Sequence, residues 1–143
     1  MAVIVAAGLA CSGVNSKTNT FATLADARAA GAVAQGWVPE GIPSQSHDLR
    51  EAHIPNSTKR WGLFEYPPSE EAALRALLQS AEITLDGQHC DIPARVEWWP
   101  LVLRGDLDAA RISATGLRAY RSKREDLIFA VNWRQARAYY WTP

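Results

Sequence analysis

The chain has 143 residues, of which 48% are hydrophobic, and it carries 15 basic and 15 acidic side chains. This length suits a single domain, and the composition can bury a core, which excludes a chain that is disordered throughout. The formal net charge of zero argues against a nucleic-acid-binding protein, because such proteins carry an excess of Lys and Arg.

Residues 1–16 contain no charged side chain, and their apolar run ends in small residues just before Cys11. The run has about the length of a signal-peptide core, ~7–15 residues, and a small residue before a cysteine resembles the acylation site of bacterial lipoproteins. Gly8 stands where such sites usually have Leu, and the basic start of a signal is missing. We predict a truncated lipoprotein-type signal and tether over residues 1–19, with lipid on Cys11.

Two alternatives remain open for this segment. Residues 2–5 are rich in Val and Ile, which also suits a first strand of the fold. Cys11 could instead form a disulfide with Cys90, the second of the two cysteines, or Cys90 could be a buried free thiol. No run reaches the ~20 apolar residues of a membrane-spanning helix, so membrane contact is expected through the lipid anchor only.

Residues 20–143 are predicted to form one domain. Residues 20–31 suit a short helix, with Thr23 as its N-cap and Gly31 as its stop. Residues 36–48 are rich in Gly, Pro and Ser and predict an irregular loop. Residues 48–54 and 60–66 predict a β-hairpin, with Ala52, Ile54, Phe64 and Tyr66 on one face.

The second half supplies further elements. Residues 67–81 predict the clearest helix, with Ser69 as N-cap and a buried stripe of Leu74, Leu77, Leu78 and Ala81. A strand is expected at 94–103, a short helix within 106–121, and a second hairpin from 126–133 and 136–142. The predicted fold is α+β: a small antiparallel sheet built from two hairpins plus an extra strand, with two or three helices packed on one face.

One stretch carries a family resemblance. Its residues are Gly36-Trp37-Val38-Pro39, Ile42-Pro43, the strand from Asp48-Leu49 to His53, and Trp61-Gly62-x-Phe64. This pattern resembles the YbbD-like family of small bacterial proteins, and residues 25–31 and 129–141 extend the likeness over most of 20–141. Acidic residues often follow the His in that family, whereas Ile54-Pro55-Asn56-Ser57 stand here. The resemblance implies export or lipid anchoring, and it brings no activity with it.

Few residues suggest catalysis or metal binding. His47-Asp48, His53 and the run His89-Cys90-Asp91 lack the paired spacing of a zinc site, so no metal and no cofactor are predicted. A nucleophilic Cys90 would need His47 or His53 beside it. Glu65 could approach Asp48 or Glu51 across the hairpin, but exposed strand charges explain these carboxylates more simply.

Trp98-Trp99-Pro100 suggests either an aromatic platform for a peptide or glycan, or one core Trp beside one at the sheet edge. We therefore expect a non-enzymatic envelope lipoprotein domain, outside the cytoplasm, that binds an envelope protein or cell-wall component. Its candidate binding surface comprises Trp98, Trp99 and His53, and no catalytic residue is assigned. The alternatives are a small hydrolase using His53 or Cys90, and an immunity-type or inhibitor protein.

Overall fold

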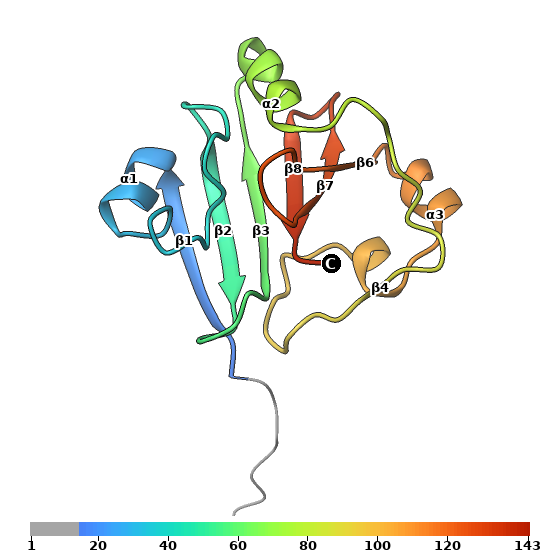
Figure 1. The fold of residues 1–143 in the computed structure, drawn as a ribbon, viewed down its shortest axis with the longest axis horizontal. Coiled ribbons are helices and arrows are strands. Elements are labelled where there is room, and N and C mark those ends of the chain that lie inside the picture. The colour runs from blue at the N-terminus through green and yellow to red at the C-terminus, as the bar shows by residue number, and fades with distance from the viewer. Residues whose placement is uncertain (1–14) are drawn as a thin grey trace, which may run out of the picture.

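The computed structural model describes residues 15–143, in which six antiparallel strands form one sheet (Figure 1). The strand order across this sheet is β1-β2-β3-β8-β7-β6, and β4 and β5 form a separate pair. The strands are β1 (Lys17–Thr23), β2 (His47–His53), β3 (Arg60–Glu65), β4 (His89–Cys90), β5 (Gly105–Asp106), β6 (Arg118–Arg121), β7 (Ile128–Asn132) and β8 (Arg137–Trp141). The helices are α1 (Leu24–Ala29), α2 (Glu71–Leu77) and α3 (Ala109–Ala114), with 3-10 turns at Pro68–Glu70 and Leu101–Leu103. The predicted α+β class with an antiparallel sheet is confirmed.

Both predicted hairpins are present, because β2 pairs with β3 and β7 pairs with β8. One detail of the first hairpin was predicted wrongly. Ala52 lies opposite Trp61, and these two residues pack in one core while Phe64 packs in another. Side chains alternate between the faces of a strand, so Phe64, three residues after Trp61, must point the other way.

The N-terminal part of the described chain contains a strand that the sequence analysis missed. Residues 17–19 belong to β1 and not to a tether, since Asn19 pairs with Glu51 of β2. The β-branched and aromatic residues of this stretch favour a strand over the predicted helix at 20–23. Thr23 caps α1 as predicted, with its hydroxyl accepting a hydrogen bond from the Asp26 amide at 3.1 Å. Cys11 lies outside the described residues.

Three further elements differ from the prediction. Ser69 is not a cap: it lies in a 3-10 turn, α2 begins at Glu71 and ends at Leu77, and Ala81 is exposed beyond it. No strand forms at 94–103, because Pro100 cannot donate to a ladder and a 3-10 turn follows it. Of the helix expected within 106–121, α3 takes only six residues, and β6 takes the end.

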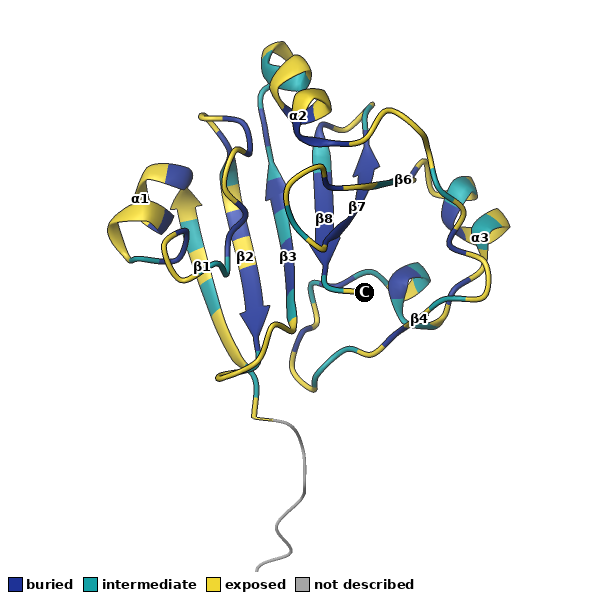
Figure 2. Cartoon of the chain, in the orientation of Figure 1, coloured by how far each residue is buried: buried dark blue, intermediate teal, exposed yellow. Residues whose placement is uncertain are grey.

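The helices cover both faces of the sheet, and the expectation of helices on one face is wrong. The first core contains Leu24 of α1 and Leu74 of α2 against Phe129 and other residues of one sheet face. The second core contains Ile112 of α3 against Ile128 and others of the opposite face. Every residue of β7 is buried (Figure 2). A strand buried on both sides needs a layer on each, which explains the arrangement.

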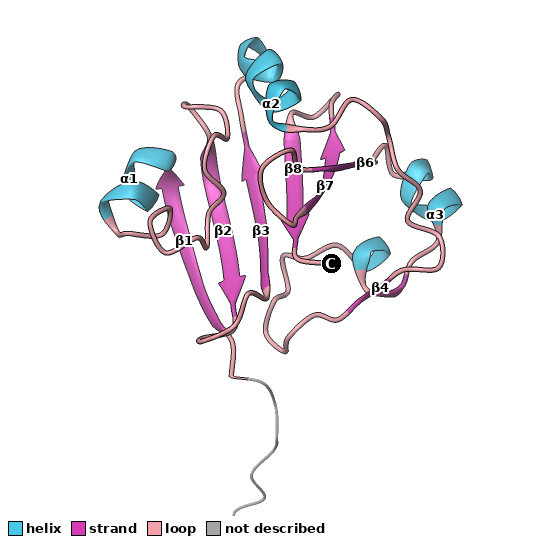
Figure 3. Ribbon diagram, viewed as in Figure 1, coloured by secondary structure: helices cyan, strands magenta, loops and turns pink. Residues whose placement is uncertain are grey.

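The helices that supply these layers are short, six or seven residues each (Figure 3). Among residues 15–143, no helix combines the length and the apolar composition that crossing a bilayer requires.

Candidate functional site

Residues from several separate segments of the chain meet at one polar cavity of about 360 Å³. Gly36 and Trp37 come from the loop after α1, His53 ends β2, and Arg60 begins β3. The first three belong to the sequence pattern on which the family resemblance rests. The residues of this pattern are therefore close together in space as well as in sequence.

His53 is the central side chain of this cavity, and it is held from two sides. Its ring stacks on Trp37, with centroids 3.9 Å apart and planes within 8°. Its Nδ1 lies 2.9 Å from Oε2 of Glu51, and both side chains are buried, with exposed fractions of 6% and 0%. The other Glu51 oxygen accepts a hydrogen bond from the Asn19 amide at 2.5 Å.

This arrangement fixes the role of each imidazole nitrogen. With the Glu51 carboxylate as the acceptor, the Nδ1–H group of His53 is the donor of this hydrogen bond. Nε2 makes no hydrogen bond within residues 15–143, and the His53 side chain lines the cavity. Nε2 is thus the ring nitrogen of His53 that remains available to a bound group.

Two glycines make room for the groups around His53. Gly36 has φ +80°, and a Cβ there would lie 3.2 Å from Nη1 of Arg60. At Gly62 a Cβ would overlap the ring of Tyr140, whose hydroxyl donates to the backbone oxygen of Trp37 at 2.8 Å. Burial raises the pKa of Tyr140, so this hydroxyl stays protonated and remains a donor. Strand β8 thereby holds the loop that carries Trp37.

Arg60 provides a positive charge in the cavity wall. Its Nη2 donates to Oε1 of Glu125 at 3.0 Å, and its side chain is 15% exposed. Its Nε is buried and has no hydrogen-bond partner within the described residues. Lys59, Ser57 and Asp126 also line the cavity, so its wall offers charged groups of both signs.

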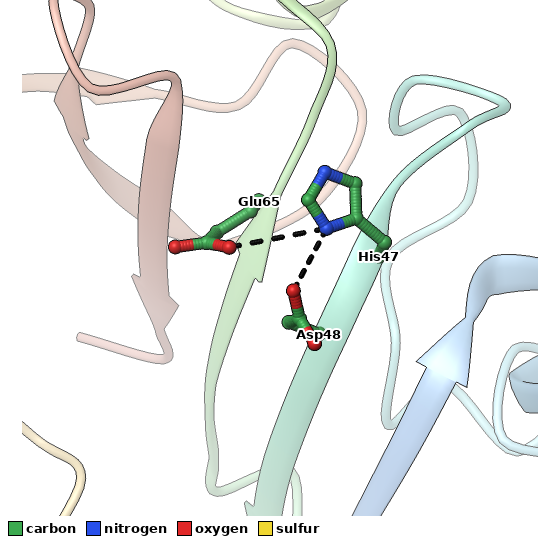
Figure 4. Close-up of side chains that lie close together, drawn as sticks. All are labelled: His47, Asp48 and Glu65. Atoms are coloured by element: carbon green, nitrogen blue, oxygen red, sulfur yellow. Dashed lines mark hydrogen bonds and ion pairs between the residues drawn. The ribbon is translucent and has the colours of Figure 1, made fainter.

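A second cluster lies at the opposite end of β2, where His47, Asp48 and Glu65 approach one another (Figure 4). Nδ1 of His47 lies 2.9 Å from Oδ2 of Asp48 and 3.8 Å from Oε2 of Glu65. The side chains are 43%, 69% and 27% exposed, respectively. The nearness of Glu65 to Asp48 is the cross-hairpin approach of carboxylates that the sequence analysis considered.

A β-bulge creates this second cluster. Consecutive strand residues normally point to opposite faces, which would separate His47 from Asp48. The register between β2 and β3 shifts between His47 and Arg50, and Asp48 has φ 50°. The bulge re-aims Asp48 toward His47, whose partner across the strands is Glu65. Hydrogen bonding to His47 is the main reason that the pKa of Asp48 lies below its usual value.

Glu65 uses its two oxygens differently. Arg137, its cross-strand neighbour on β8, donates from Nε to Oε1 at 3.0 Å and also from Nη2 to the same oxygen. Oε2 is the oxygen nearest to His47. Arg137 therefore orients the Glu65 carboxylate and leaves one oxygen for the cluster.

Comparison with known proteins bears on the first of these two clusters. Residues 15–65 match the family model described as the YbbD head domain. Over these residues the chain is YbbD-like. The match is shorter than the resemblance over 20–141, but it spans β1 to β3 and contains Trp37, Glu51, His53 and Arg60. No curated protein and no solved structure matches the chain.

The YbbD-like segment supplies one of the three residues of the predicted binding surface, and the other two lie elsewhere. Trp99 is 1% exposed and packs edge-on against Tyr139 and Trp141 in the second core. Trp98 is half-buried beside it. His53 packs on the other face of the sheet, against Trp37. The structure thus does not bring His53 together with Trp98 and Trp99.

The fold also separates Cys90 from His53. Cys90 lines a different cavity, of about 550 Å³, together with Trp61 and His89. Burial raises the pKa of its thiol to about 12, so the nucleophilic thiolate is scarce at neutral pH. His89 is exposed beside it, with Nδ1 2.7 Å from Asp106 and Nε2 2.8 Å from Asp91. Neither Cys90 nor His89 lines the cavity at His53.

His53 is predicted from the sequence as a site residue, whereas the residues that surround it are not. Glu51 precedes His53 by two positions in a predicted strand, and this spacing places both side chains on one face. The contributions of Trp37, Arg60 and Tyr140 carry no such signal. They depend on loop geometry and on the order of the strands. The spacing of neighbouring residues in the sequence predicts neither of these.

Proposed function

We propose that this chain is a non-enzymatic binding module of the bacterial cell envelope, and that its partner inserts a polar group into the cavity at His53. The observation that carries the proposal is the buried Glu51–His53 pair, whose imidazole lines a cavity and whose Nε2 makes no hydrogen bond within residues 15–143. Burying such a pair costs stability, so its presence at a cavity favours a binding role over a structural one.

The proposed anchor is lipid on Cys11. Five residues separate Cys11 from β1, so the chain between them can span at most about 20 Å. Lys17, at the start of β1, pairs with His53. A lipid on Cys11 would therefore hold the His53 end of the sheet near the membrane surface. The partner is then an envelope protein or a cell-wall component within reach of that surface.

The anchor is tested by the intact mass of the protein purified from bacterial membranes, expressed with its natural upstream DNA. We expect loss of residues 1–10 and added acyl chains on Cys11. Recovery from the cytosol of an unmodified chain that starts at Met1 would reject the anchor and leave the cavity proposal standing.

The binding site is tested separately by crosslinking in cells. A photoreactive residue replaces Gln35 at the cavity wall, and the control places it at Ser113 on α3. We expect a crosslinked species from position 35 that is lost when His53→Gln is added, and none from position 113. Equal crosslinking from both positions, or crosslinking insensitive to His53→Gln, would argue against the cavity.

A small hydrolase is the second candidate, because a carboxylate on Nδ1 is also how a general-base histidine is oriented. Hydrolysis of p-nitrophenyl acetate that disappears in His53→Gln and persists in His89→Gln would favour this candidate. The Cys90 version of the hydrolase has no support from the fold, since Cys90 and His53 line different cavities. An inhibitor or immunity-type protein is a form of the binding proposal in which the partner is an enzyme or toxin.

A further inference from the structure

We propose that His47, Asp48 and Glu65 form a binding site for a divalent transition-metal ion, for which zinc is the reference ion. This site is independent of the cavity at His53, because the two lie at opposite ends of β2, about 20 Å apart at the usual rise of a strand. It replaces the sequence-based expectation that the chain holds no metal.

The geometry of the cluster suits such an ion. One ligand atom from each residue lies within 4.8 Å of the others. Two ligand atoms on a tetrahedral zinc ion are about 3.4 Å apart, since each lies about 2.0–2.1 Å from the metal. The distances from Nδ1 of His47, 2.9 Å to Asp48 and 3.8 Å to Glu65, lie on either side of that value. Both distances lie within about 0.5 Å of that value, so small side-chain movements would bring His47 and each carboxylate to the spacing of a bound ion.

The ligand chemistry agrees with this assignment. One imidazole nitrogen and two carboxylate oxygens are ligands that zinc and similar ions accept, and the partial exposure of all three leaves a coordination position open to water or to a partner. The Nδ1 lone pair of His47 would face the ion, with the proton on Nε2. Arg137 neutralises part of the charge of Glu65 but binds Oε1, and so leaves Oε2 free as the ligand.

The chain contains a natural control for this inference. His89 also lies between two carboxylates, yet Asp106 approaches its Nδ1 and Asp91 its Nε2. Carboxylates on opposite sides of one ring cannot meet on the ion that either nitrogen binds. One imidazole and two carboxylates are thus present in a convergent arrangement at His47 and in a divergent one at His89.

The test is titration of the full chain with zinc chloride by isothermal calorimetry. We expect one bound ion per chain and a loss of at least tenfold in affinity in each of His47→Gln, Asp48→Asn and Glu65→Gln, with His89→Gln and Cys11→Ser unchanged. Asp48 is the most exposed ligand, so Asp48→Asn should keep the wild-type melting temperature and exclude unfolding as the cause. Absence of binding at 1 mM zinc, binding that persists in His47→Gln or Asp48→Asn, or binding lost in His89→Gln would overturn the proposal.

Discussion

Glu51 shows how one residue determines the character of its surroundings. It is fully buried, it lies in a strand, and its hydrogen-bond partners are the imidazole of His53 and the side-chain amide of Asn19. A buried hydrogen-bonded polar pair contributes little net stability compared with an apolar pair of the same volume, but removal of one partner leaves an uncompensated polar group. Substitution of one member of the Glu51–His53 pair should therefore destabilise the fold strongly, whereas replacement of both members by apolar residues should destabilise it less.

We expect Glu51→Ala to lower the free energy of unfolding by about 3–5 kcal/mol, measured by urea denaturation. The double variant Glu51→Leu/His53→Leu should lose less than the sum of the two single variants, because no unpaired polar group remains. A loss under about 1 kcal/mol in Glu51→Ala would show that water reaches this carboxylate and that the pair is not buried in solution.

At the scale of elements, the close approach of strands β3 and β8 determines how the cavity is built. The Tyr140 ring lies over Gly62 and reaches the loop that carries Trp37. A side chain on β3 at this position would push the ring away, and the loop would lose its anchor on the sheet. Gly62 is thus required for space and not for backbone freedom.

Gly62→Ala should destabilise the protein by about 1–3 kcal/mol through overpacking, since the added Cβ would overlap ring atoms. Tyr140→Phe is the control: it removes only the hydroxyl bond to Trp37, with an expected cost of about 0.5–1.5 kcal/mol. Thermal unfolding of both variants measures the difference. Wild-type stability in Gly62→Ala would mean that Tyr140 has room to move aside without cost.

The β4–β5 pair contains a pH-sensitive interaction between His89 and two aspartates. His89 bonds to Asp106 of the paired strand and to Asp91, and these two bonds raise its pKa above the ordinary value of 6.5. A raised folded-state pKa stabilises the fold at pH values below the unfolded-state pKa, and this contribution is lost as the pH rises through the folded-state pKa.

The melting temperature of His89→Gln should therefore fall below that of the wild type at pH 5.5, with the two converging by pH 9. Asp106→Asn should reproduce more of this effect than Asp91→Asn, because the bond to Asp106 is the larger cause of the shift. A gap between wild type and His89→Gln that is constant with pH would assign the effect to packing.

For the whole molecule, β1 joins the sheet at an edge but completes the buried site. Asn19 satisfies one oxygen of Glu51, and Thr23 caps α1, which packs on the first core. Removal of β1 would therefore expose an edge and also leave a buried carboxylate without one of its donors.

We expect a chain that begins at Leu24 to fail to fold cooperatively, whereas one that begins at Asn15 should melt at the temperature of the full chain. Circular dichroism with temperature distinguishes these outcomes. Cooperative melting of the chain that begins at Leu24 would show that β1 is dispensable and that the tether extends to residue 23.

The sequence by itself determined the elements whose signals are local. The two hairpins follow from alternating strands around short turns, and the Thr23 cap follows from a hydroxyl three residues before an available amide. The prediction of a strand at residues 94–103 was wrong, because an apolar run rich in Trp is compatible with a strand and also with a buried loop. In this segment the indole N–H of Trp99 donates a hydrogen bond to the backbone oxygen of Leu103, at the end of a 3-10 turn. The hydrophobic periodicity of the sequence does not predict such a turn.

Only the tertiary structure decided which residues share a site. His53 stacks on Trp37, which lies 16 positions before it in the sequence. Tyr140 lies 103 positions after Trp37, and its hydrogen bond to Trp37 depends on β8 lying beside β3. Likewise, a bulge of one residue turns Asp48 from the face opposite His47 toward it. Pairing order and bulges are set by the packing of two cores on one sheet. That packing is a property of the whole chain, and no short stretch of sequence contains it.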